Sequence, residues 1–84
     1  MTELTADERR LQWHCRRGLK ELDVILGPFF DAHYATLDAG DKAVFARLID
    51  CEDMDLFNWF MRQAAPADPE LERMIELILD RLGR

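Results

Sequence analysis

The sequence predicts an all-α protein, a single compact five-helix bundle that spans residues 1–84. Apolar residues recur at the three- and four-residue spacings of a helix face, and helix-start signals recur between them. No run alternates with a period of two, and no Asn-Gly or Asp-Gly hairpin turn occurs. At 84 residues, 49% of them apolar, the chain can form one modest hydrophobic core and has no room for a second.

The first helix is expected to begin at Thr5-Ala6-Asp7-Glu8, which has the form of a capping box. Leu11 and Cys15 follow at helical spacing. Arg16-Arg17 would then lie in the last turn, where cations suit the negative end of the helix dipole. Gly18 is a plausible end to this helix.

The second helix is expected from the apolar spacing of Leu19, Leu22 and Ile25. Gly27-Pro28 is expected to break or kink it, because a residue before proline avoids the α region. A short further turn or helix would cover residues 29–34, and residues 35–37 would be a connector.

Three further helices complete the predicted bundle. Asp38 is expected to cap the third and Asp53 the fourth, and residues 64–67 form a loop. The fifth helix begins at Asp68-Pro69-Glu70, with proline in the first helical position, and Gly83 ends it. The residues that we assign to the core are Leu22, Ile25, Phe29, Phe45, Leu48, Phe57, Phe60, Ile75 and Leu79.

The charge of the chain argues against several classes of partner. A net charge of −6 is wrong for a general nucleic-acid binder, which needs a basic face. Residues 1–20 carry five basic and three acidic groups, a net of +2, which leaves −8 for residues 21–84. This basic corner on an acidic body favours a protein or an anionic group as the partner. Because no long apolar run or signal-like start occurs, we expect a protein of the cytoplasm that is not inserted in a membrane. We also expect it to be a monomer.

No catalytic, cofactor-binding or metal site is predicted. Cys15 and Cys51 are expected to be reduced, and neither has a partner at metal-ligand spacing; His14 beside Cys15 would point about 100° away on a helix. No phosphate-binding glycine loop and no Rossmann glycine pattern occurs. The acidic run Glu52-Asp53-Met54-Asp55 is interpreted as a helix cap. We therefore expect that the protein is not an enzyme.

The stretch from Arg16 to Asp23 is the main functional candidate, because it surrounds a lone glycine with charged groups. Glycine in helical surroundings costs about 1 kcal/mol relative to alanine. Gly18 therefore either ends a helix or clears space for a close approach to the backbone. If this stretch is helical, Arg17 and Glu21 stand four residues apart on one face. They would be a surface ion pair, or the two sides of a notch floored by Gly18 in which a partner's backbone could settle.

Trp13 and the run Cys15 to Asp23 resemble the family of succinate dehydrogenase flavinylation factors. The signature of that family is arginine-glycine, two variable residues and glutamate, which Arg17, Gly18 and Glu21 match in place. The resemblance covers nearly the whole chain. It continues through Pro28-Phe29-Phe30, Phe45 with Leu48, Asp55-Leu56-Phe57-Asn58-Trp59, Pro66-Ala67-Asp68 and Glu70-Leu71.

The resemblance implies a five-helix assembly factor that promotes covalent attachment of FAD to the flavoprotein subunit of succinate dehydrogenase, and in some bacteria of fumarate reductase. Such a factor acts on the FAD of its client and is expected to hold no cofactor stably. The expected partner-binding residues are Arg17, Gly18, Glu21, Arg16, Asp23, Trp13 and Trp59. Trp59 fits a place in the core equally well. Two alternatives stay open: an antitoxin-like protein-binding module, because bacterial relatives are also labelled antitoxins, and a direct carrier of FAD.

Overall fold

The computed structural model describes residues 4–83, so residues 1–3 and 84 of the expected domain lie outside the description. Within it the chain forms five α-helices and one 3-10 helix, with no strand. This confirms the predicted all-α class. The elements are α1 (Ala6–His14), α2 (Lys20–His33), η1 (Tyr34–Thr36), α3 (Ala39–Ile49), α4 (Asp53–Phe60) and α5 (Pro69–Arg81).

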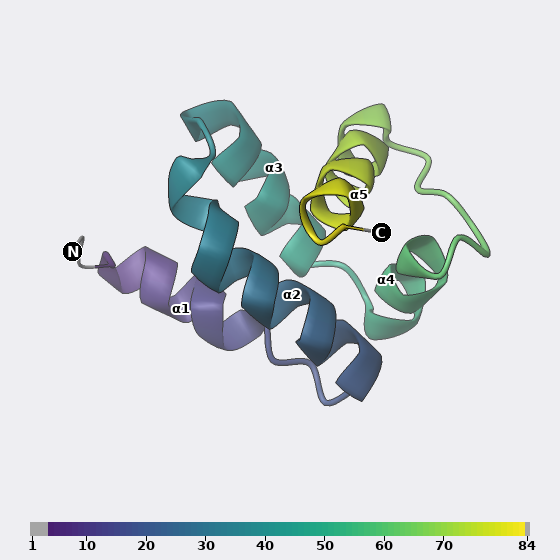
Figure 1. The fold of residues 1–84 in the computed structure, drawn as a ribbon, viewed down its shortest axis with the longest axis horizontal. Coiled ribbons are helices and arrows are strands. Elements are labelled where there is room, and N and C mark those ends of the chain that lie inside the picture. Colours follow the sequence, from purple (N-terminus) through teal and green to yellow (C-terminus); the bar gives the residue numbers. More distant parts are fainter. Residues whose placement is uncertain (1–3, 84) are drawn as a thin grey trace.

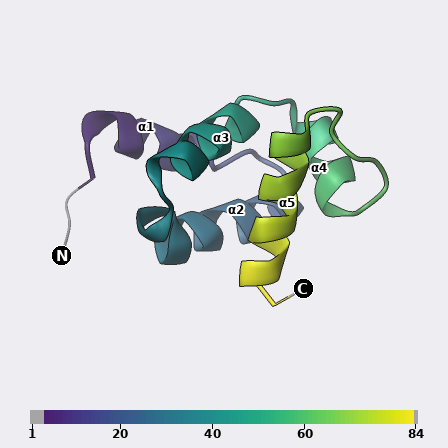
Figure 2. The ribbon, with the colours of Figure 1, turned by 90° about the horizontal axis from the view of Figure 1, so that it is seen from above.

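The helices pack in an irregular bundle rather than in parallel rows. In Figure 1, α1 lies next to α2 at the lower left, α5 is seen almost end-on, and α4 is at the right. In Figure 2, α1 and α3 lie on one side of α2, and α5 runs across the ends of α2 and α3. The most extensive contact between two α-helices is that of α3 with α5, and α2 contacts both α4 and α5.

Three helix starts form as the sequence predicts. At α1 the Thr5 hydroxyl accepts the Glu8 N–H at 3.1 Å, and the Glu8 carboxylate accepts the Thr5 N–H at 3.0 Å, which closes the capping box. Asp38 and Asp68 cap α3 and α5, with side-chain oxygens 2.7 and 2.9 Å from amide nitrogens of the first turn. Gly83 follows α5 with a φ of +75°, as expected of a glycine that ends a helix.

Of the break or kink expected at Gly27-Pro28, the break is wrong, because α2 continues from Lys20 to His33 as one helix (Figure 1). Pro28 cannot donate to the Val24 carbonyl, but Pro28 and Val24 are both exposed, so water can satisfy that oxygen. Gly27 carries no Cβ to clash with the proline ring, which relaxes the restriction on the residue before proline. The helix loses one hydrogen bond on its solvent side and keeps its buried face.

Two further boundaries differ from the prediction. Helix α1 ends at His14 with Cys15 as its C-cap, so Arg16-Arg17 lie beyond the last turn, and Gly18 does not end this helix. Glu52, not Asp53, is the N-cap of α4. The Asp53 carboxylate is turned toward a side chain from another part of the chain, described below.

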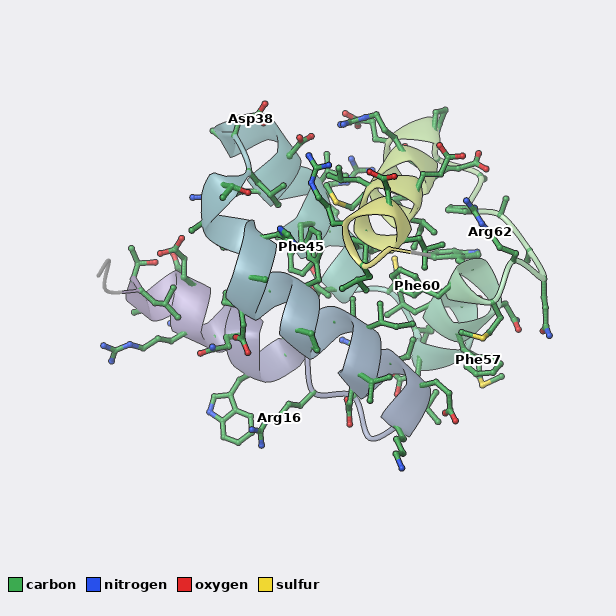
Figure 3. The ribbon with its side chains drawn as sticks, viewed as in Figure 1. Arg16, Asp38, Phe45, Phe57, Phe60 and Arg62 are labelled. Carbon is green, nitrogen blue, oxygen red and sulfur yellow. The ribbon has the colours of Figure 1, made fainter. Side chains whose placement is uncertain are left out.

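The core lies where α2, α3 and α5 meet. Phe45 is at its centre (Figure 3), with its ring centroid 5.6 Å from that of Phe29 and 5.7 Å from that of Tyr34. The predicted core residues are all buried except Phe57, which is half-buried. Helix α1 contains no fully buried residue within its bounds, but its Leu11 is partly buried against the core and the helix contacts α3.

Candidate docking site

Residues 15–19 form a loop that joins α1 to α2. The Cys15 N–H still donates to the Leu11 carbonyl at 3.1 Å, and its side chain is buried. Gly18 has a φ of +86°, a conformation that residues with a side chain rarely adopt. Leu19 then begins α2 as its N-cap. The glycine therefore turns the chain inside the loop.

Arg17 turns its side chain into the molecule, where only 9% of it is exposed. Its Nε donates to Asp53 Oδ1 at 2.7 Å. Its Nη1 donates to the carbonyls of Ile49, at 2.6 Å, and His14, at 3.1 Å. Its Nη2 donates to the Cys51 carbonyl at 2.7 Å. One guanidinium thus ties the α1–α2 loop to the segment that joins α3 to α4.

The local structure explains why a guanidinium occupies this place. His14 and Ile49 are the last residues of α1 and α3, where carbonyls lack helical donors and the dipole is negative. Asp53 is the first residue of α4, where a carboxylate is favoured. Only arginine offers five N–H donors in a planar fork. Asp53 is 38% exposed, and the contacts with the Ile49 and Cys51 carbonyls are partly buried. Removing the guanidinium would leave these groups without their donor and would cost on the order of 3 kcal/mol.

Asp23 fixes the loop from its other side. Its Oδ1 accepts the backbone N–H of Arg17 at 2.7 Å. Asp23 lies in the first turn of α2, where a carboxylate also suits the positive helix end. Its oxygen holds the backbone just before Gly18, so Asp23 and the Arg17 side chain together set the shape of the loop. We call these two residues the inner side of the loop.

Four other residues lie on the solvent side, which we call the outer face of the loop. Trp13 is 69% exposed, and the Arg16 guanidinium stacks 5.2 Å from its ring centroid. Figure 3 shows Arg16 pointing away from the body of the molecule. A Cβ on Gly18 would meet nothing within 4 Å, and Glu21 is exposed in the first turn of α2.

The predicted relation of Arg17 and Glu21 on one helix face is wrong, because Arg17 lies in the loop and its guanidinium goes inward to Asp53. A notch with this guanidinium as one side therefore does not form. Of the three signature residues, Gly18 and Glu21 are open to solvent. Trp59, on α4, is half-buried and packs against the core, apart from the cleft that Trp13 lines.

Sequence reasoning missed a cleft of about 670 Å³ between α1 and α2. It also missed Gln12 and Asp31, whose side chains meet across it with Nε2 and Oδ1 3.2 Å apart. The sequence did contain one signal for this cleft. Gly27 and Pro28 are both unfavourable inside a helix, so their presence within α2 calls for an explanation, and both line the cleft. The cleft residues that matter below are Trp13, Arg16, Asp23, Gly27, Pro28 and Asp31.

The two thiols show no sign of reactivity. Burial raises the pKa of Cys15 to about 12, so this thiol stays protonated at neutral pH. Burial also raises the pKa of Cys51, and both cysteines are free. Across residues 4–83 no group of histidine, cysteine and acidic side chains could hold a metal ion. No helix in that part of the chain is long and apolar enough to cross a membrane.

Comparison with known proteins gives consistent matches over most of the chain. The family described as flavinator of succinate dehydrogenase matches residues 9–82. The FAD assembly factor SdhE of Pseudomonas aeruginosa is 52% identical over 80 residues, which cover 92% of this chain and 95% of the relative. The factor of the same name from Pseudomonas putida is 52% identical over 73 residues, 87% of each chain. That from Pectobacterium atrosepticum is 49% identical over 75 residues, 89% of this chain and 85% of the relative.

Proposed function

The chain belongs to the family of flavinators of succinate dehydrogenase, and on that premise we propose that it is an assembly factor for covalent FAD. Its client would be the flavoprotein subunit of succinate dehydrogenase, with that of fumarate reductase as a second client of the same chemistry. The observation that carries the proposal is the open backbone at Gly18, in a chain about half identical to FAD assembly factors. We further propose that it acts as a monomer in the cytoplasm.

The outer face of the loop is the proposed docking surface. Gly18 would allow the client's backbone to approach closely, since no side chain stands over it. Glu21 and Arg16 offer opposite charges at either end of the same loop, and both are exposed. Trp13 adds a large rigid contact area, which is typical of residues that dominate binding energy. Arg17 and Asp23 would contribute by holding the loop in the shape that presents these groups.

The proposed mechanism is positioning rather than catalysis. Covalent flavinylation joins a histidine of the client to the 8α carbon of the flavin and requires stabilisation of negative charge on the isoalloxazine. The client and its flavin carry the reacting atoms, so holding histidine and ring in place is the contribution left to the factor. FAD is here the client's cofactor, and no residue of this chain is assigned to it.

Deletion of the gene tests the proposal. The client subunit is separated in a denaturing gel, where covalently bound flavin fluoresces, and an immunoblot measures the amount of subunit. We expect fluorescence per subunit to fall strongly in the deletion strain and to return when the gene is supplied on a plasmid. Undiminished fluorescence would contradict the proposal. The alternative, an antitoxin-like protein-binding module, would then be tested by copurification of a toxin partner.

A further inference from the structure

The cleft between α1 and α2 shares Trp13 and Arg16 with the outer face of the loop and continues from there along α2 to Asp31. One wall comes from α1 and its C-terminal end, with the exposed Trp13 indole and Arg16 stacked on it. The other comes from α2, with Asp31, Gly27 and Pro28. A volume of about 670 Å³ is in the range of sites that hold a small molecule or a few residues of a peptide.

The α2 wall has a backbone feature that most helices lack. Pro28 has no N–H, so the carbonyl of Val24 has no helical donor, and Val24 is 51% exposed. Gly27 leaves the wall open, since a Cβ there would meet nothing within 4 Å. The Val24 carbonyl therefore lacks its usual helical donor beside the wall formed by Gly27 and Pro28, although Val24 itself does not line the cleft. A partner with an unpaired backbone N–H could satisfy it, which an extended segment offers and the interior of a helix does not.

The charges of the two walls differ in sign. Asp31 accepts a hydrogen bond from the neutral Gln12 amide, and Asp23 accepts one from the backbone N–H of Arg17. Within residues 4–83 neither carboxylate has a lysine or arginine within ion-pair distance. The α2 wall therefore presents two negative charges that lack a cationic partner, whereas the α1 wall presents Arg16.

We propose that this cleft receives an extended segment of the client flavoprotein that carries a lysine or arginine, an inference that rests on the proposed function. The cationic side chain pairs with Asp31, and Asp23, about two helical turns away on α2, adds to the negative charge of the same wall. An apolar neighbour of the cationic residue packs between Trp13 and Pro28. Side chains of an extended segment point to alternate sides, so one segment can serve both walls. The negative α2 wall disfavours a nucleic acid or an anionic membrane in the same place.

Binding to the purified client subunit tests the cleft. Isothermal titration calorimetry compares the wild-type chain with Asp31→Asn, which keeps an acceptor for Gln12, and with Asp31→Arg. We expect the Kd to rise about tenfold for Asp31→Asn and further for Asp31→Arg, with a weaker salt dependence than wild type. Trp13→Ala should raise the Kd by a similar factor. The matched control is Asp80→Arg, an exposed carboxylate of α5 outside this cleft, which should leave the Kd unchanged.

A carbodiimide cross-link between Asp31 and a lysine of the client, mapped by mass spectrometry, would support the same pairing. Thermal unfolding of each variant shows that the fold is kept. If wild type binds the client and both Asp31 variants bind equally well, the cleft proposal fails and the proposed function stands. If wild type neither binds the client nor restores flavin fluorescence in the deletion strain, the proposed function itself fails.

Discussion

Arg16 and Arg17 are neighbours in the chain but lie in opposite surroundings. The Arg17 side chain is 9% exposed, and its guanidinium donates to one carboxylate and three carbonyls. The Arg16 guanidinium stacks on the ring of Trp13, a residue that is 69% exposed, and among the described residues it has no carboxylate within ion-pair distance. The inner side of the loop thus sets its shape, whereas the outer face is open to a partner.

The largest effect is expected for Arg17→Ala. It leaves the carbonyls of His14, Ile49 and Cys51 and the Asp53 carboxylate without their donor, so the free energy of unfolding should fall by about 3 kcal/mol. Lysine keeps the charge without the fork, so Arg17→Lys should fall between alanine and wild type. Denaturant unfolding measures both. Equal stability of Arg17→Ala and wild type would show that the inner side is not structural.

Arg17→Ala is also expected to raise the alkylation rate of the Cys15 thiol, which lies two residues before Arg17. In the wild type this thiol is buried and its pKa is raised to about 12, so alkylation at pH 8 requires opening of the structure. A loss of about 3 kcal/mol in Arg17→Ala should speed its alkylation on the order of a hundredfold. Peptide mapping by mass spectrometry separates Cys15 from Cys51. Arg16→Ala serves as the control and should leave the rate unchanged.

A smaller effect is expected at two glycines with matching backbone. Gly18 and Gly83 have φ values of +86° and +75°, and a Cβ on either meets nothing within 4 Å. Alanine at each should cost about 1 kcal/mol of stability, and asparagine less, because asparagine tolerates positive φ. The two positions should therefore behave alike in denaturant unfolding. A much larger loss at Gly18 would mean that this glycine is needed for the fold and not only for access.

The smallest effect on stability is expected for Arg16→Ala. The residue is exposed and its side chain stacks on Trp13, so the free energy of unfolding should change by less than about 0.5 kcal/mol. Binding to the client subunit should nevertheless weaken. Calorimetry of unfolding and of binding on the same preparation separates the two. A stability loss comparable to that of Arg17→Ala would remove the distinction between the two arginines.

Local signals were sufficient for much of the fold. The caps at Thr5, Asp38 and Asp68 bind amides two or three residues away, so the sequence contains the whole interaction. The rule for Gly27-Pro28 failed because the buried face of α2 outweighs one lost hydrogen bond. That face consists of Leu22, Ile25, Leu26, Phe29 and Phe30.

The site was predictable only in its outer part. The sequence marked Gly18 and Glu21, and both are exposed. The inward turn of Arg17 could not be predicted, because its partner Asp53 is 36 residues away and its other partners are mostly backbone carbonyls that have no sequence pattern. Asp31 was missed for the same reason, since it meets Gln12 across 19 residues. Contacts between distant segments depend on helix packing that periodicity alone does not fix.

The central claim is that Gly18 serves docking on the client and not only the fold. It is tested best by Gly18→Asn and Gly83→Asn in the deletion strain, with in-gel flavin fluorescence of the client subunit as the readout. Both variants carry the same backbone cost, and only the first adds bulk to the outer face of the loop. We predict that Gly83→Asn restores fluorescence to the wild-type level and that Gly18→Asn, present in equal amount, does not. Full restoration by Gly18→Asn would contradict docking through this loop.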